Sequence, residues 1–159
     1  MQARNAALVV LLAVLTFVSA ADGTSRTSKP TASKQRVMIT SKAGVDRFTL
    51  VWLKPGAAIT DYGSVDYCCY SARHLVRDGQ SVLVNDPRET LAGKRGTLVL
   101  RVRIEWLDAG NAYTVGVSTW KVVRGTGAYE GVTGGGRGAA SWLPRGPVSF
   151  HVDGFLTSK

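Results

Sequence analysis

The chain has 159 residues, and its 20 Lys and Arg against 11 Asp and Glu give a formal net charge of +9 at pH 7. The two histidines and the two adjacent cysteines have no spacing typical of a zinc site, so we expect no metal and no cofactor. The basic residues are dispersed rather than interleaved with aromatic ones, which argues against specific nucleic-acid binding and favours at most a weak attraction to anionic cell-envelope polymers.

The first twenty residues predict a Sec-type signal peptide. Arg4 supplies a positive n-region, residues 6–18 form an almost uninterrupted apolar run, and Val18-Ser19-Ala20 matches the small-x-small cleavage rule. A single-pass anchor is less favoured, because the run is shorter than the roughly 20 residues that a membrane-spanning helix needs. We therefore expect cleavage near Ala20 and a secreted, extracellular protein with no membrane span in the mature chain.

Residues 21–35 predict a flexible leader. They are rich in Ser, Thr, Lys, Gly and Ala and contain no larger aliphatic side chain. Such a segment cannot bury enough apolar surface to offset its ordering entropy. Residues 36–159 remain, which is enough chain for one domain and too little for two ordinary ones.

The domain has a β pattern throughout, because short strand-like segments alternate with Gly, Pro, Asn and Asp. The predicted strands are 36–41, 47–53, 64–70, 81–84, 97–106, 113–123, 138–142 and 148–155. With no convincing helix among them, these eight strands indicate a barrel or a sandwich.

Segment 97–106 has the clearest alternation, with one apolar face and one largely polar face. If the apolar face points into a barrel, it provides most of a possible cavity lining. The predicted lining residues are Trp52, Leu98, Leu100, Val102, Ile104 and Trp106.

Segment 47–53 is apolar on both faces. Phe48 and Trp52 share one face, while Val51 and Leu53 lie on the other. Either a covering segment or a second subunit would bury the outer face. Apolar residues also occur singly on the surfaces of ordinary monomers. The two alternatives are therefore a homo-oligomer and a monomer with a few exposed apolar side chains.

Segment 119–142 places seven glycines between two strand-like ends. A dinucleotide-binding pattern starting at Gly125 fails, because its sixth position is Glu130. A phosphate-binding loop starting at Gly131 also fails, since Arg137 stands where Lys is required. The glycines are better explained as tight turns and strand bends that help to close a barrel.

Four pieces of the sequence resemble a known family. They are Gly-Thr-Leu at 96–98, Ser-Thr-Trp-Lys-Val-Val at 118–123, Gly-Thr-Gly-Ala-Tyr-Glu-Gly at 125–131 and Gly-Gly-Gly at 134–136. Together they resemble the secreted bacterial allene oxide cyclase barrel-like family, related to plant dirigent proteins, over residues 65–155. The resemblance implies an eight-stranded antiparallel β-barrel around an apolar cavity, and a trimer as in plant relatives. The plant enzymes' catalytic residues cannot be placed on this chain, so it implies no reaction.

Few residues qualify as catalytic. Ser149, His151 and Asp153 share one face of the last predicted strand, but alternate residues lie about 6.5 to 7 Å apart, too far for a catalytic triad. A carboxyl group buried in the apolar interior of a barrel would have a raised pKa, which suits proton transfer. Glu89 and Tyr129 are the leading catalytic candidates.

Cys68 and Cys69 are adjacent within Tyr-Cys-Cys-Tyr. Their Cα atoms are about 3.8 Å apart, below the usual disulfide range, so a vicinal bridge would be strained. An oxidising compartment nevertheless disfavours free thiols. A vicinal disulfide, an intermolecular bridge, and one buried plus one exposed thiol are all consistent with the sequence.

The sequence thus supports two functional hypotheses. The preferred one is a non-catalytic secreted barrel that binds an apolar small molecule or a cell-envelope component. The alternative is a cyclase-like or dirigent-like isomerase that guides a reactive apolar intermediate within the barrel cavity.

Overall fold

The computed structural model describes residues 33–53, 59–69, 71–143 and 145–158, which form strands, turns and one short 3-10 helix. The expected signal peptide, and the expected leader up to residue 32, lie outside the described residues. The elements are β1 (Ser33–Lys42), β2 (Arg47–Trp52), β3 (Ile59–Cys68), β4 (Ala72–Arg77), β5 (Gln80–Asn85), β6 (Arg88–Gly93), β7 (Gly96–Asp108), β8 (Thr114–Gly125), η1 (Gly127–Tyr129), β9 (Thr133–Trp142) and β10 (Ser149–Ser158).

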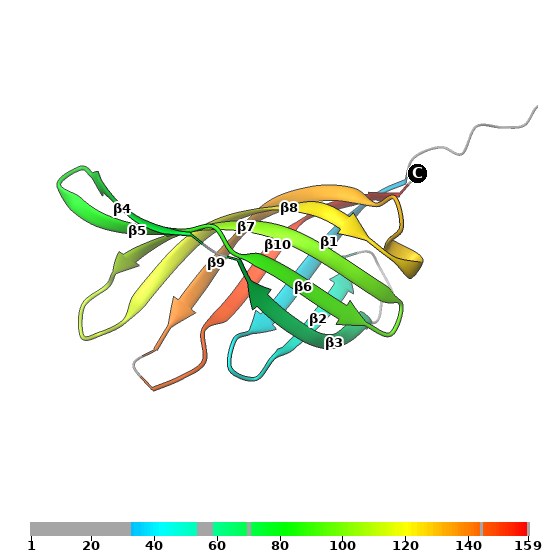
Figure 1. Ribbon diagram of the computed structural model, residues 1–159, viewed down its shortest axis with the longest axis horizontal. Helices are drawn as coiled ribbons and strands as arrows, with labels where there is room; N and C mark the ends of the chain where they lie inside the picture. The colour runs from blue at the N-terminus through cyan, green and yellow to red at the C-terminus, as the bar shows by residue number, and fades with distance from the viewer. Residues whose placement is uncertain (1–32, 54–58, 70, 144, 159) are drawn as a thin grey trace, which may run out of the picture.

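The strands form a closed antiparallel barrel (Figure 1). Around the ring the order is β7-β6-β3-β2-β1-β10-β9-β8, and the pairing of β8 with β7 closes it. The prediction of an all-β, eight-stranded antiparallel barrel is therefore confirmed. Closure leaves no unpaired edge within the ring.

The β4–β5 hairpin is additional to the ring and projects beyond its rim (Figure 1). Both β5 and β6 pair with β7, but β6 pairs with its first half and β5 only near its end, from Leu83 to Asn85. Pro87, between β5 and β6, accepts a hydrogen bond from the amide of Val102 at 2.9 Å. The chain thus runs along one edge of β7 from the hairpin into the barrel wall.

Several boundaries differ from the sequence-based expectation. β1 begins at Ser33, so residues 33–35, expected in the leader, belong to the barrel. β4 and β6 were not predicted, because β4 is exposed throughout and an inward position of β6 holds the polar Glu89, which hides its alternation. β9 begins at Thr133, so the glycines at 134–136 lie in a strand rather than in a turn.

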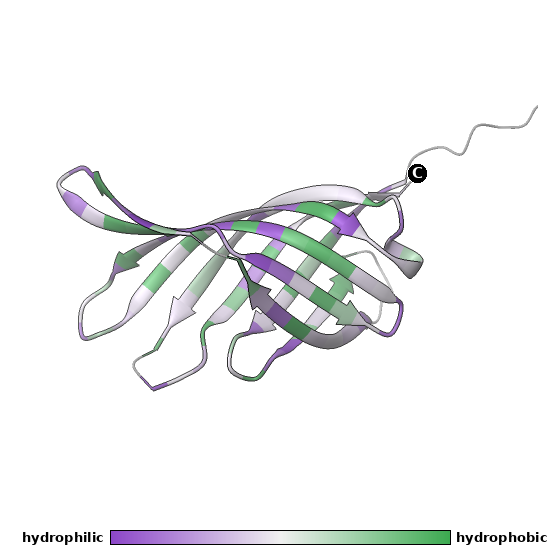
Figure 2. Ribbon diagram, in the orientation of Figure 1, coloured by the Kyte–Doolittle hydropathy of each residue, from purple (hydrophilic) through white to green (hydrophobic). Residues whose placement is uncertain are grey.

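The middle of the barrel is packed with apolar side chains, which alternate with polar ones along the strands (Figure 2). On β7, the side chains of Leu98, Leu100 and Val102 are almost completely buried. We expected both faces of β2 to be buried, but only the inner face is, with Phe48 and Leu50 almost completely buried. On the outer face, Leu53, just beyond the end of β2, is 41% exposed. The apolar faces of the strands supply most of the stabilisation.

Glycines in β9 and β10 make room for Trp120 of β8. The Trp120 side chain is buried, and its indole Nε1 donates a hydrogen bond to the carbonyl oxygen of Asp153 at 3.1 Å. A Cβ atom added at Gly154 would lie 2.8 Å from Cζ2 of Trp120 and would also meet the carbonyl oxygen of Gly135. The glycine-rich segment therefore lets a large aromatic ring pack against bare backbone.

Gly154→Ala should lower the free energy of unfolding by about 2 to 3 kcal/mol, because backbone and indole must both move away from the new methyl group. Urea denaturation followed by tryptophan fluorescence measures the change. The control is Gly131→Ala, where φ is +68° but nothing lies within 4 Å of the added Cβ, and which should cost about 1 kcal/mol. An equal or smaller effect at Gly154 would contradict this packing explanation.

Candidate functional site

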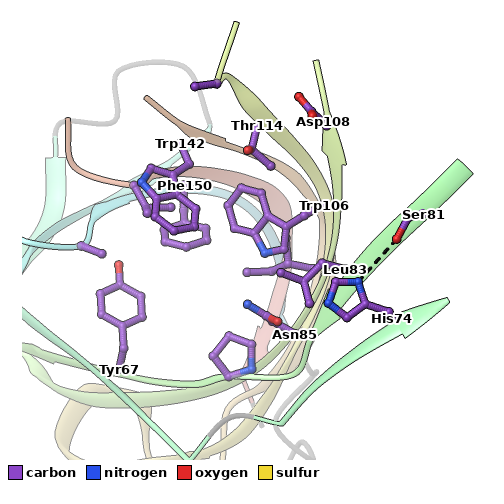
Figure 3. A pocket seen from close by; sticks show the side chains of 15 residues that line it. Tyr67, His74, Ser81, Leu83, Asn85, Trp106, Asp108, Thr114, Trp142 and Phe150 are labelled. Carbon is purple, nitrogen blue, oxygen red and sulfur yellow. Dashed lines mark hydrogen bonds between the residues drawn. The ribbon is translucent and has the colours of Figure 1, made fainter. Parts of the chain in front are cut away.

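A cavity of about 510 Å³ opens at one mouth of the barrel (Figure 3). Its walls come from the ends of strands and turns that meet at this mouth, including the hairpin and the β7–β8 turn. The lining residues are Ala43, Tyr67, His74, Ser81, Leu83, Asn85, Pro87, Ile104, Trp106, Asp108, Ala112, Thr114, Trp142, Val148 and Phe150. The volume lies in the range of sites for small organic ligands.

Aromatic side chains form much of the wall. The ring of Phe150 lies 5.6 Å from that of Tyr67 and 6.3 Å from that of Trp106, the latter in an edge-to-face arrangement. Trp142 stands at the rim and is 52% exposed, which is unusual for so large an apolar side chain. These rings offer flat apolar surfaces to a ligand.

Two buried polar atoms at the cavity have no hydrogen-bond partner in the described part of the chain, namely the hydroxyl of Tyr67 and Oδ1 of Asn85. Ser41 is close enough to influence the pKa of Tyr67, but no hydrogen bond of good geometry joins them. Buried polar groups are normally paired, so such atoms at a cavity indicate a place for a polar group of a ligand.

Glu89 of β6 lies beside Tyr67, two residues after Pro87, which lines the cavity. Its neighbours across the sheet are Tyr67 of β3 and Leu100 of β7. Its side chain is 4% exposed, and it forms no hydrogen bond or ion pair with any described residue. Burial raises its pKa from 4.5 to about 7. Burial, followed by the nearby Glu89 charge, raises the pKa of Tyr67.

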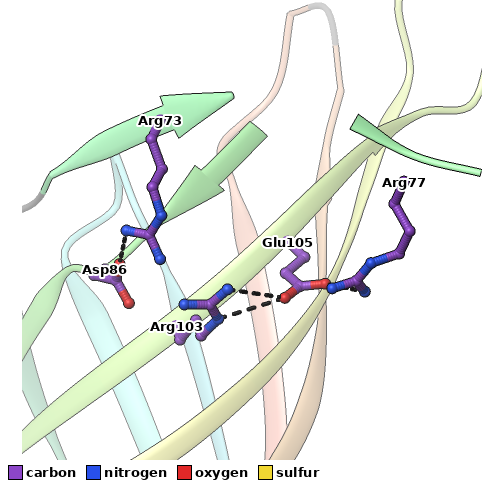
Figure 4. Close-up of polar contacts among 5 residues, drawn as sticks. All are labelled: Arg73, Arg77, Asp86, Arg103 and Glu105. Carbon is purple, nitrogen blue, oxygen red and sulfur yellow. Dashed lines mark hydrogen bonds and ion pairs between the residues drawn. The ribbon is translucent and has the colours of Figure 1, made fainter. Parts of the chain in front are cut away.

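Three ion pairs lie where the hairpin meets the barrel wall beside the mouth (Figure 4). Arg73 lies 2.7 Å from Asp86, Arg77 lies 2.7 Å from Glu105, and Arg103 lies 3.2 Å from the same Glu105 carboxylate. Exposed pairs of this kind contribute little stability one by one. Arg77 of β4 joins the hairpin to Glu105 of β7, whereas Arg73 joins β4 to the segment that follows β5. In the hairpin, Nδ1 of His74 lies 3.4 Å from the Ser81 hydroxyl at the cavity wall.

The structure places the two catalytic candidates at opposite ends of the barrel. Glu89 lies beneath the cavity, whereas Tyr129 of η1 donates a hydrogen bond to Asp61 at 2.9 Å near the other end. Asp61 is 2% exposed and also accepts hydrogen bonds from the amides of Tyr62, Lys94 and Arg95. Burial and the hydrogen bond to Asp61 raise the pKa of Tyr129. This arrangement anchors η1 to the barrel wall.

The predicted cavity lining is only partly found at the cavity. Ile104 and Trp106 line it, but Leu98, Leu100 and Val102 pack in the filled middle of the barrel. Trp52 borders a separate pocket at the other end, next to Tyr129. The reason is that β7 is 13 residues long and crosses the barrel wall obliquely, so only its last inward residues reach this mouth.

Sequence reasoning did not single out Tyr67, Asn85, Trp142 or Phe150 as site residues. Phe150 follows from the alternation of β10, whose inward residues are buried. Tyr67 and Asn85 belong to no sequence motif that indicates a binding site. They become a site only through the pairing of β3 with β6 and of β5 and β6 with β7.

The remaining candidates lie outside the cavity. His151 is exposed on the outer face of β10, and Asp153 on the same face pairs with Arg36 at 2.8 Å. Cys68 is half-buried and Cys69 exposed, and neither sulfur is bridged. Among the described residues, no three His, Cys, Asp or Glu side chains gather as a metal site would require. The same ranges contain no helix long and apolar enough to cross a bilayer.

The fold and the site define a class, a closed antiparallel β-barrel with a largely apolar cavity at one mouth. Comparisons with protein-family models, with curated proteins and with solved structures found no match. The resemblance to the allene oxide cyclase barrel-like family therefore stays a prediction from sequence.

Proposed function

We propose that the protein binds an apolar small molecule bearing one polar group in the cavity at the barrel mouth. The supporting observation is a 510 Å³ apolar cavity lined by Tyr67 and Asn85, each with a buried polar atom that no described residue pairs. A ligand's apolar body would contact Trp106 and Phe150, and its polar group would pair with these atoms. Shape and apolar contact would supply affinity, while the few polar atoms would orient the ligand.

Val148→Trp should strongly weaken binding of a neutral apolar dye such as N-phenyl-1-naphthylamine. Val148 is half-buried and lines the cavity, so an indole there occupies the space that a ligand needs. We expect saturable binding at one site by fluorescence titration, and at least a roughly tenfold loss of affinity in this variant.

The matched control is Val117→Trp, which adds the same indole at a residue that is 60% exposed on the outer face of β8. It should leave dye affinity within about twofold of the original. Absence of saturable binding, or equal losses in both variants, would show that the cavity is not a ligand site.

A second candidate function, an isomerase, is favoured by one observation, the buried Glu89, which has no partner among the described residues and whose pKa is about 7. A carboxyl group with that pKa gives and takes protons readily near neutral pH. Native mass spectrometry of protein from its source would identify a co-purifying ligand as the trial substrate. With that ligand, Glu89→Gln should slow isomerisation by about 10²-fold or more, as followed by chromatography. Equal conversion by both proteins would leave binding as the function.

We further propose that binding occurs outside the cell, after removal of the first twenty residues, and that a cell-envelope component is one possible ligand. The support is the signal-peptide pattern around Ala20 and the basic charge of the chain. Intact mass of the protein recovered from culture medium tests the cleavage position. Recovery of the uncleaved chain in the cell fraction alone would contradict it.

A further inference from the structure

The described lining of the cavity holds acidic and aromatic side chains but no Lys or Arg that would suit an anionic ligand. Among the residues that the structure describes, Asp108 is the acid that lines the cavity. Glu89, beneath it, is a second acid with no partner in the described part of the chain. A carboxylate or phosphate entering this cavity would lose its hydration and gain no countercharge.

The same surroundings suit an organic cation. Aromatic faces attract ammonium groups, most strongly where water is excluded. Tyr67, Trp106 and Phe150 present such rings close together, and Trp142 adds a fourth at the rim. The hydroxyl of Tyr67 and Oδ1 of Asn85 are free to accept hydrogen bonds from an N–H donor.

We propose that the cavity selects an apolar organic ammonium ion, with its cationic end at Tyr67, Asn85 and Glu89 and its apolar body between the aromatic rings. The inference rests on the proposed binding function and names the ligand class. The ammonium group would supply the countercharge that Glu89 lacks, and its N–H groups would pair with the two orphaned polar atoms. Neutral ligands of the same shape would bind more weakly, and carboxylates most weakly.

Ammonium binding should strengthen as the pH rises. The groups around Glu89 are Tyr67 from β3 and the apolar Leu100 from β7, with His74 and Asp108 at the mouth. Because the pKa of Glu89 is about 7, most of the carboxyl groups are protonated at pH 6 and ionised at pH 8. The ammonium ion stays charged at both pH values and prefers the ionised form, so its affinity should be about tenfold higher at pH 8.

The test compares three probes with one naphthalene ring and one exocyclic carbon, namely 2-naphthylmethylamine, 2-naphthylmethanol and 2-naphthoate. Isothermal titration calorimetry at pH 8 should show the amine binding at least about tenfold more tightly than the alcohol, and the carboxylate more weakly than both. In Glu89→Gln the ratio of amine to alcohol affinity should fall to about two or less, and the amine should lose its dependence on pH.

The control is Glu105→Gln, which removes a negative charge that is paired with Arg77 and Arg103 outside the cavity. This variant should keep the preference for the amine. If the alcohol binds as tightly as the amine, or if Glu89→Gln keeps the preference, selection of a cation is overturned while ligand binding stands. If no probe binds and the neutral dye also fails to bind, both proposals fall.

Discussion

Replacing Asp61 with alanine should lower the free energy of unfolding by about 4 kcal/mol, the largest effect expected from a single substitution at a polar residue of this barrel. Its buried carboxylate accepts hydrogen bonds from the amides of Tyr62, Lys94 and Arg95 and from the hydroxyl of Tyr129, at 2.9 to 3.3 Å. Alanine leaves these donors without an acceptor, and each buried unpaired donor costs about 1 to 3 kcal/mol. Urea denaturation followed by tryptophan fluorescence measures the loss.

Tyr129→Phe is the matched control, since it removes one of these hydrogen bonds and leaves the carboxylate with three backbone donors. It should cost about 1 kcal/mol. A loss in Asp61→Ala no larger than that in Tyr129→Phe would show that the amides find other acceptors and that Asp61 does not organise this end of the barrel.

Glu89→Gln should make the protein more stable above neutral pH. The pKa of Glu89 is about 7 in the folded protein and 4.5 when the carboxyl group is in water. The folded state therefore binds the proton more tightly, and the original protein loses stability as the pH rises from 4.5 through 7. That difference in pKa corresponds to about 3 kcal/mol above pH 7. Glutamine cannot ionise, so the variant should be about 3 kcal/mol more stable at pH 8 and nearly equal to the original at pH 4.5.

Urea unfolding of both proteins between pH 4.5 and pH 8 measures this difference. Glu105→Gln serves as the control, because its carboxylate pairs with Arg77 and Arg103 near the surface. Its removal should change stability by about 1 kcal/mol or less and should not stabilise the protein at pH 8. A constant difference between Glu89→Gln and the original across this pH range would mean that Glu89 titrates like an exposed carboxyl group.

The two buried acids, Asp61 and Glu89, differ in their hydrogen-bond partners, and this difference assigns Asp61 to stability and Glu89 to the proposed ligand site. Asp61 is surrounded by donors and stabilises the barrel, whereas Glu89 has no partner among the described residues and destabilises it above pH 7. Groups that reduce stability while remaining buried are frequent at binding and catalytic sites. A ligand in the neighbouring cavity would supply the positive charge or hydrogen-bond donor that no described residue offers to Glu89.

Alternation along the chain predicted an all-β barrel or sandwich, and the family resemblance favoured the closed barrel. On β7 the inward residues found in the structure are those predicted from sequence, and Glu105 points outward as the alternation requires. The strand period of two follows from backbone geometry alone, so it can be read without any tertiary contact. The glycine-rich segment was harder to interpret, because the clearance that Trp120 needs at Gly154 involves strands that are distant in sequence.

The sequence by itself determined the all-β class and, on β7, which side chains face inward. It did not determine how far along the barrel axis each inward side chain lies, which separates Trp106 at the cavity from Leu100 in the packed middle. Only the tertiary structure placed Glu89 beside Tyr67 beneath an open mouth and Tyr129 at the opposite end. The physical reason is that depth depends on strand tilt and on the stagger of hydrogen-bonded neighbours around the closed ring, which pairing between distant segments sets.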